Sequence, residues 1–227
     1  MAKKPYKLHN IVAIVVLSML ILSLIFGITG MILSSLTQGR VFGRENIEYV
    51  KITLQCIVGL IAWFLPSLIE RQLKITFFSG IHIMYVIFLF LAIILGEVSG
   101  YYRRFFHWDT VLHTLSGAML SAFGFSIIDT INRSEKINLG LSDWFMSFFA
   151  FCFAAMLDTV WEIFEFIIDA FLDLNLQQYR LPDGTVLIGH YAVADTMKDL
   201  IADVLGALFV CIVGYLILRR RRKRALS

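Results

Sequence analysis

Charged residues are scarce in this sequence. Only 16% of its 227 residues are charged and 59% are hydrophobic, whereas about a quarter of a typical soluble domain is charged. An ordinary soluble domain is therefore excluded, and the chain is expected to lie in a bilayer. No low-complexity segment, evident repeat or long linker divides it, so residues 1–227 are expected to form a single transmembrane domain.

Cysteine is rare as well. The three cysteines, Cys56, Cys152 and Cys211, each lie within an apolar run. None has a second Cys or a His at the spacing of a zinc motif, which argues against a structural zinc site. We interpret all three as small core residues.

Six apolar runs are long enough to supply the ~20 residues that span the hydrocarbon of a bilayer. The first follows three lysines as a signal peptide would, but its length and the lack of a small-residue cleavage site predict a retained helix. The sequence thus predicts an all-α, polytopic integral membrane protein with a bundle of six transmembrane helices. The predicted helices cover about residues 11–33, 50–69, 75–95, 111–131, 142–172 and 192–218.

The placement of Lys and Arg predicts the orientation, because these residues are retained preferentially on the cytoplasmic side. With the N-terminus inside, thirteen of the 20 basic residues fall in cytoplasmic segments and five in outer segments. Both termini are therefore expected in the cytoplasm. The basic run at residues 219–224 directly follows an apolar stretch, so its expected partner is anionic membrane lipid and not nucleic acid. The cytoplasmic set is Lys3, Lys4, Lys7, Arg71, Lys74, Arg133, Lys136 and the run from Arg219 to Arg224.

Acidic residues and one histidine form a stripe on each of the last three predicted helices. Side chains three, four, seven or eight residues apart share one face of a helix. Counting ~20 residues from the cytoplasmic end of each helix reaches this stripe in all three cases, which predicts a common depth near the outer edge of the hydrocarbon. The stripes comprise Asp109 and His113; Asp158, Glu162, Glu165 and Asp169; and Asp195, Asp199 and Asp203.

So many carboxylates cannot all stay ionised in a low dielectric without compensation, and a divalent cation would supply it. Oxygen ligands with one His suit Mg²⁺, Mn²⁺ or iron better than structural zinc. The alternative is a network of protonated carboxyl groups that only fixes helix packing. The candidate ligands are Asp109, His113, Glu162, Glu165, Asp195 and Asp199, with Asp158, Asp203 and Lys198 expected to support them.

Two outer segments have features of their own. Residues 101–108 are aromatic and basic, which predicts either an anchoring aromatic belt or a site where Arg103, Arg104 and His107 contact an anionic headgroup. Residues 175–191 contain Pro and Gly between two strand-like stretches, and a short β-hairpin is a candidate structure there.

Three motifs occur in order in the second half of the chain: Trp108-Asp109 with His113 and Gly117, Trp161-Glu162 with Glu165, and Asp195-Thr196 with Asp199 ahead of Gly206-Ala207. This order gives the chain a resemblance to the bacterial YjdF-type multi-pass inner-membrane proteins. It implies a bacterial cytoplasmic membrane and a joint action of the six candidate ligands, but no particular reaction. Asp158 and Asp203 lie outside the family pattern.

The functional hypothesis that follows is a divalent-metal-dependent membrane enzyme, a hydrolase or transferase, acting on a lipid or lipid-linked substrate at the outer leaflet. A cation- or proton-coupled transporter is the alternative, although Pro66 is the only proline in an apolar run and no pair of broken helices is predicted. A structural or assembly protein is the second alternative.

Overall fold

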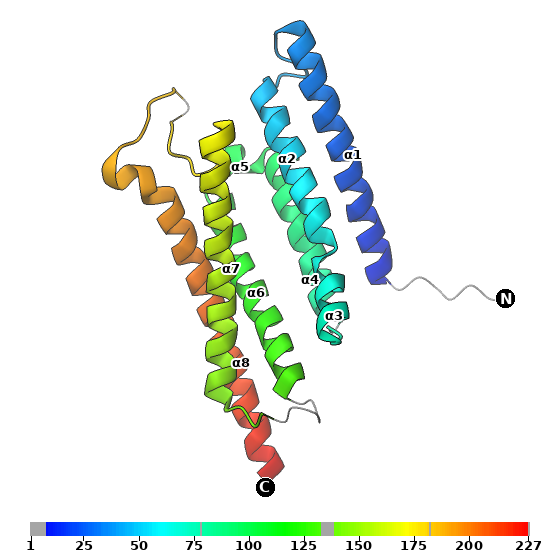
Figure 1. Ribbon diagram of the computed structural model, residues 1–227, viewed down its shortest axis with the longest axis vertical. Helices are drawn as coiled ribbons and strands as arrows, with labels where there is room; N and C mark the ends of the chain where they lie inside the picture. The colour runs from blue at the N-terminus through cyan, green and yellow to red at the C-terminus, as the bar shows by residue number, and fades with distance from the viewer. Residues whose placement is uncertain (1–7, 78, 133–138, 182, 227) are drawn as a thin grey trace, which may run out of the picture. The chain divides into compact units, whose positions relative to one another are not determined.

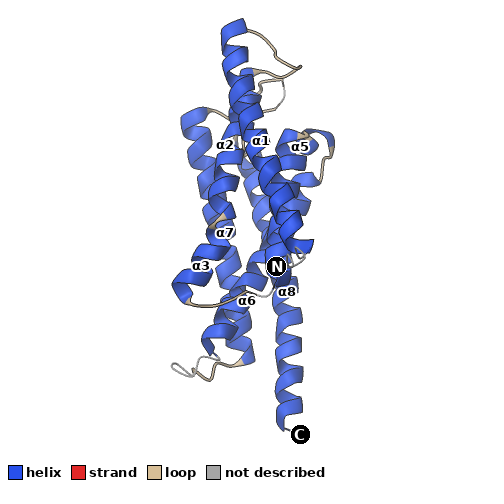
Figure 2. Cartoon of the chain, turned by 90° about the vertical axis from the view of Figure 1, so that its right-hand side faces the viewer, coloured by secondary structure: helices blue, strands red, loops and turns tan. Residues whose placement is uncertain are grey.

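The computed structural model describes residues 8–77, 79–132, 139–181 and 183–226. The basic residues Lys3, Lys4, Lys7, Arg133 and Lys136, on which the orientation count partly rests, lie outside these ranges. The chain divides into two compact units, Met1–Trp108 and Asp109–Ser227, and each is described by itself. Helices dominate both units, and the described residues form no strand, only the isolated antiparallel bridges Val41–Arg44 and Arg180–Val186 (Figure 2).

The described residues of the first unit form six helical elements of different lengths, and Figure 1 shows how the labelled ones are arranged. They are α1 (Leu8–Thr37), α2 (Asn46–Trp63), α3 (Leu65–Leu73), α4 (Ser79–Leu89), the π-helix η1 (Phe90–Val98) and α5 (Tyr101–Arg104). The second unit is built from α6 (Trp108–Asn132), α7 (Asp143–Leu172), the 3-10 helix η2 (Gly189–Val193) and α8 (Ala194–Leu226).

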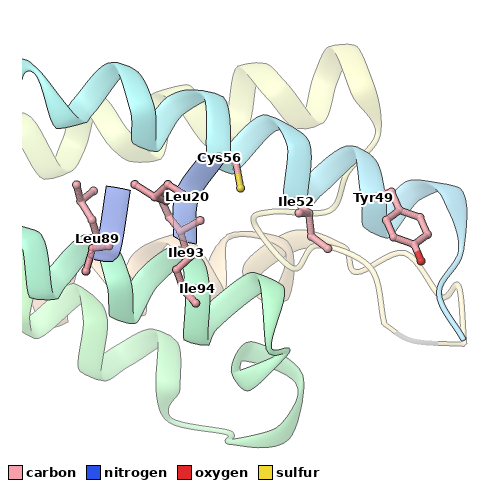
Figure 3. Close-up of a cluster of buried hydrophobic side chains, with 8 residues drawn as sticks. Leu20, Tyr49, Ile52, Cys56, Leu89, Ile93 and Ile94 are labelled. Atoms are coloured by element: carbon pink, nitrogen blue, oxygen red, sulfur yellow. The ribbon is translucent and has the colours of Figure 1, made fainter. Parts of the chain in front are cut away.

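The core of the first unit lies where α1, α2, α4 and η1 meet. Leu20, Ile52 and Cys56 are completely buried, and Ile93 packs against them (Figure 3). Tyr49 belongs to the same cluster, and its hydroxyl donates a hydrogen bond to the Val41 carbonyl at 2.6 Å. A buried phenol needs such a partner, so this bond fixes the turn between α1 and α2 against the core.

The apolar composition of the helices confirms a multi-pass membrane protein. Among the described residues, five helical segments are long and apolar enough to cross a membrane: Asn10–Thr37, Asn46–Leu73, Gly80–Val98, Trp108–Asn132 and Gly189–Arg224. They correspond to five of the six predicted runs. The remaining predicted run, residues 142–172, forms α7, a 30-residue helix with four acidic residues in its carboxyl-terminal half.

Two of the predicted spans contain irregularities that the hydropathy pattern did not predict. The helix across residues 50–69 is interrupted at Phe64, which ends α2 and caps α3, with Pro66 in the first turn of α3. Proline is tolerated there because the first turn of a helix needs no amide donor. The span across residues 75–95 begins as α4 and continues as nine residues of π-helix.

The prediction that all three cysteines are core residues was only partly right, because Cys56 and Cys211 are buried but Cys152 is exposed.

Glycines allow the helices of the second unit to approach closely. A Cβ atom added to Gly117 on α6 would lie 2.0 Å from the backbone oxygen of Asp203 on α8. A Cβ on Gly206 of α8 would lie 2.0 Å from the backbone oxygen of Thr114. The two contacts are reciprocal and involve backbone on both sides, so no rotamer change can relieve them. They hold the polar stripes of α6 and α8 face to face.

We therefore expect Gly117→Ala and Gly206→Ala each to lower the unfolding temperature in detergent, because the added methyl group must push two backbones apart. Overpacking of this kind costs about 1–3 kcal/mol. Gly39→Ala is the matched control, since its Cβ would meet nothing closer than the Thr37 oxygen at 3.7 Å. Equal unfolding temperatures for Gly117→Ala and Gly39→Ala would contradict the close packing.

Candidate metal centre

The polar stripes of α6, α7 and α8 meet in the second unit. Asp109 and His113 lie in the first two turns of α6, and Asp199 and Asp203 lie one turn apart on α8. Because α6 and α8 are in glycine-mediated contact at this level, their stripes face each other. α7 packs along α8 and adds its own acidic residues (Figure 1).

Asp109, His113 and Asp199 form the most compact group of potential ligands. One ligand atom from each of the three lies within 4.8 Å of the other two. Asp199 is 3% exposed, and Asp109 and His113 are half-buried. Two carboxylates and one imidazole at this separation suit a single divalent cation that keeps water in its remaining positions.

Asp203 orients the imidazole of His113. The Nδ1 atom of His113 lies 3.0 Å from Oδ2 of Asp203, and Nε2 lies 3.7 Å from Oδ1 of Asp109. When Nδ1–H donates to Asp203, Nε2 carries the free lone pair that a cation needs. The carboxylate–imidazole pair is therefore the arrangement commonly found behind a metal-binding histidine.

α7 adds two buried carboxyl groups, of which only one lacks partners. Oδ1 of Asp158 accepts a hydrogen bond from Ser116 at 2.9 Å, and the Asp158 carboxyl group shares a further hydrogen bond with that of Asp203, which requires one proton between the two groups. Both carboxylate oxygens of Glu162, a residue only 4% exposed, are buried and unmatched within the described part of the chain. Leaving buried polar atoms unpaired costs free energy, which points to a missing partner.

Glu162 belongs to the same electrostatic environment as the compact group. Its carboxylate interacts with the charges of His113, Asp203, Asp195 and Asp109. No described cation forms an ion pair with it within 4 Å. The centre therefore gathers negative charge from three helices around one imidazole.

The other residues predicted from the sequence do not belong to the compact group of Asp109, His113 and Asp199. Glu165 is half-buried and accepts a hydrogen bond from the Trp161 indole at 3.1 Å. Asp195 is half-buried and Lys198 is exposed.

The residues predicted to contact a headgroup lie in the first unit. Arg103 forms an ion pair with Glu48, whereas Arg104 and His107 are exposed.

The loop after α7 reaches the centre through a residue that sequence reasoning missed. Nε2 of Gln178 donates a hydrogen bond to Oδ2 of Asp109 at 3.1 Å. Asp169 holds this loop by accepting bonds from the backbone amides of Leu176 and Gln177 at 2.7 and 2.9 Å. Asp169 is thus a buried structural residue. A glutamine in a loop between two acidic helices carries no spacing signal that would have identified it.

A second set of contacts closes the same loop on its exposed side. Arg180 and Tyr179 both donate to the carboxylate of Asp173, and these bonds lower the pKa of Asp173. The bridge between Arg180 and Val186 follows directly, so the predicted hairpin is present in a minimal form.

A family model and one relative match this chain. The model of the predicted membrane protein family DUF2238 matches residues 8–220. An uncharacterized protein of Thermotoga maritima is 29% identical over 128 residues, which cover 56% of this chain. The chain spans little more than half of that relative's length, 57%. No solved structure matches.

Proposed function

This chain belongs to the DUF2238 family of predicted membrane proteins, and we propose that it binds a divalent cation at Asp109, His113 and Asp199 and uses it as a membrane enzyme. One observation carries the proposal: the compact ligand group borders Glu162, a buried side chain with two unmatched carboxylate oxygens. A cation at the centre offsets the negative charge and gives these oxygens a partner, directly or through bound water.

We assign roles by position. Asp109, His113 and Asp199 are the proposed ligands, and Asp203 orients His113. Glu162, Glu165 and Asp195 complete the proposed set, with Asp158 and Lys198 in supporting positions. Mg²⁺, Mn²⁺ or iron is favoured over structural Zn²⁺ by the predominance of oxygen ligands.

The proposed chemistry is hydrolysis or transfer at the phosphate of a lipid or lipid-linked substrate. A cation held by Asp109, His113 and Asp199 would polarise a phosphoryl oxygen and lower the pKa of water. In the proposed reaction water attacks phosphorus while a carboxylate takes its proton, the bond from phosphorus to the leaving oxygen breaks, and the same carboxyl group returns the proton to the leaving oxygen. Glu162 is the proposed proton acceptor, because neither of its oxygens is engaged elsewhere among the described residues.

A cation- or proton-coupled transporter is a second candidate. It is favoured by the buried oxygens of Asp158 and Asp203, which extend the polar stripe beyond the compact group. A carboxylate series of this kind is typical of ion and proton pathways in membranes.

We further propose six membrane spans with both termini in the cytoplasm of a bacterium, and a YjdF-type relationship within the family. α7 is the proposed sixth span: its 30 residues give a length of about 45 Å, against a hydrocarbon thickness of about 30 Å. Asp158 and Glu162 of α7 interact with the charges of His113 and Asp203 at the centre, where the proposed cation offsets negative charge. The centre then lies toward the outer leaflet.

Cysteine labelling tests this topology. With Cys56, Cys152 and Cys211 replaced by serine, Asp183→Cys is expected to react with a membrane-impermeant maleimide in intact cells. Leu139→Cys, in the connection before α7, is expected to react only after lysis, because it lies on the opposite side of the membrane. Reaction of Leu139→Cys in intact cells, with Asp183→Cys protected, would reverse the orientation and remove the outer-leaflet proposal.

Metal analysis tests the centre. Protein purified in mild detergent without chelators is expected to contain a stoichiometric divalent metal. His113→Ala and Asp199→Asn should weaken its binding by at least about tenfold, as should Asp203→Asn through loss of the contact that orients His113. Asp129→Asn is the matched control on α6, about 30 Å from Asp109 along the helix axis, and should retain the metal.

Two functional assays on the purified wild-type protein distinguish an enzyme from a transporter. An enzyme shows metal-dependent turnover in detergent without a gradient, whereas a transporter shows ion-dependent flux only in proteoliposomes. Wild type that is metal-free, and that is not stabilised thermally by Mg²⁺, Mn²⁺, Fe²⁺ or Zn²⁺, would remove the metal site and leave the proton-coupled transporter and the packing network of carboxyl groups.

A further inference from the structure

A separate group of charges lies in the first unit and contains none of the proposed metal ligands. It brings together the turn after α1, the first half of α2, the end of η1 and α5. We call it the Glu97 cluster, because the carboxylate of Glu97 interacts electrostatically with all the other members. The members are Arg44, Glu48, Lys51, Glu97 and Arg103.

Part of the cluster is internally satisfied. Glu48 pairs with Arg103 and also accepts a hydrogen bond from the Glu45 amide at 3.0 Å. Nη2 of Arg44 donates to the carbonyl of Val98 at 2.6 Å. This last bond places the guanidinium group at the carboxyl-terminal end of η1, next to Glu97.

Charged atoms of three members remain without a direct partner among the described residues. Glu97 is only 8% exposed, yet within the described chain its carboxylate accepts no hydrogen bond and forms no ion pair within 4 Å. Nη1 of Arg44 is buried and has no acceptor among the same residues. Lys51 is half-buried and pairs with no described carboxylate at contact distance. Arg44 and Lys51 therefore interact with Glu97 electrostatically but not by direct contact.

The backbone beneath Glu97 is irregular. η1 is a π-helix, a conformation that is rare and is frequently found at functional positions. Gly96 permits it to pack here, since a Cβ at that position would lie 2.5 Å from the Tyr102 ring. Glu97 is thereby held in a buried position at the end of a membrane span.

We propose that the Glu97 cluster binds the headgroup of a phospholipid that carries a phosphodiester and a primary ammonium group. The phosphodiester accepts hydrogen bonds from Arg44 and Lys51, and the ammonium group donates to Glu97. The cluster lies where the candidate spans Asn46–Leu73 and Gly80–Val98 begin and end, which is the depth of lipid headgroups. The proposal is independent of the metal centre.

The unpaired atoms of Arg44, Lys51 and Glu97 favour this headgroup over a bare anion and over a choline headgroup. A bare anion would satisfy Arg44 and Lys51 but would add negative charge beside Glu97. A choline headgroup has the right charges, but its quaternary nitrogen has no hydrogen to donate. Arg103, one of the three residues predicted to contact a headgroup, is already paired with Glu48, so the proposal assigns the phosphate contact in this cluster to Arg44 and Lys51.

Native mass spectrometry with three lipids of identical acyl chains tests the proposal. Phosphatidylethanolamine is expected to be retained about tenfold more strongly than phosphatidylcholine, from one additional charge-assisted hydrogen bond. Phosphatidylglycerol should bind less strongly than phosphatidylethanolamine. Glu97→Gln should abolish the preference for phosphatidylethanolamine over phosphatidylglycerol, and Lys51→Gln should weaken the binding of all three lipids.

Arg40→Gln is the control, because Arg40 is an exposed cation already paired with Glu45 at the same turn. Lipid-free thermal unfolding establishes that each variant is folded, and Lys51→Gln is the main variant because Lys51 makes no direct contact that the fold needs. Equal retention of the ethanolamine and choline lipids by wild type would overturn the proposal. A preference for phosphatidylglycerol, or an Arg40→Gln effect as large as that of Lys51→Gln, would overturn it as well.

Discussion

The close approach of α6 and α8 is the constraint on which the second unit depends. The backbone oxygen of Asp203 occupies space that only a glycine at position 117 leaves open. At this approach the side chain of the same Asp203 reaches His113, one turn before Gly117 on α6, at 3.0 Å. Packing and chemistry are thus set by one residue, because moving α8 outward would separate the carboxylate from the imidazole.

The burial of several carboxylates in the second unit creates a need for compensating positive charge. Asp199, Asp203, Asp158 and Glu162 are each less than 5% exposed, and ionised carboxylates in such surroundings are costly unless a positive charge compensates them. The imidazole of His113 is neutral when its Nε2 atom binds the proposed cation, and this cation then offsets two of the negative charges. The hydrogen bond between Asp158 and Asp203 requires one proton, which removes a third. The proposed cation also gives the carboxylate oxygens of Glu162 a partner.

The sequence was sufficient to predict the features that depend on periodicity. Apolar runs located five candidate spans, and the spacing along each helix singled out Asp109, His113 and Asp199, whose ligand atoms the structure brings within 4.8 Å of one another. Tertiary features were not predictable in this way. Asp203 fell outside the family pattern, yet it contacts His113 directly, because its role depends on the distance between two helices and not on spacing along one.

Local backbone irregularities escaped prediction for a similar reason. The interruption at Phe64 and the π-helical turn before Ser99 lie inside continuous apolar runs, where hydropathy is unchanged by helix type. Gln178 reaches Asp109 only because Asp169 folds the intervening loop back toward α6. These contacts depend on the packed structure, and no pattern in the sequence encodes them separately.

The shared coordination of one cation by His113 and carboxylates is the central claim, and electron spin echo spectroscopy of the Mn²⁺-loaded protein tests it most directly. We expect one bound Mn²⁺ per chain with nitrogen modulation from a single imidazole, and loss of that modulation in His113→Gln while Asp129→Asn retains it. Bound Mn²⁺ without nitrogen modulation in wild type, or modulation that persists in His113→Gln, would contradict the account.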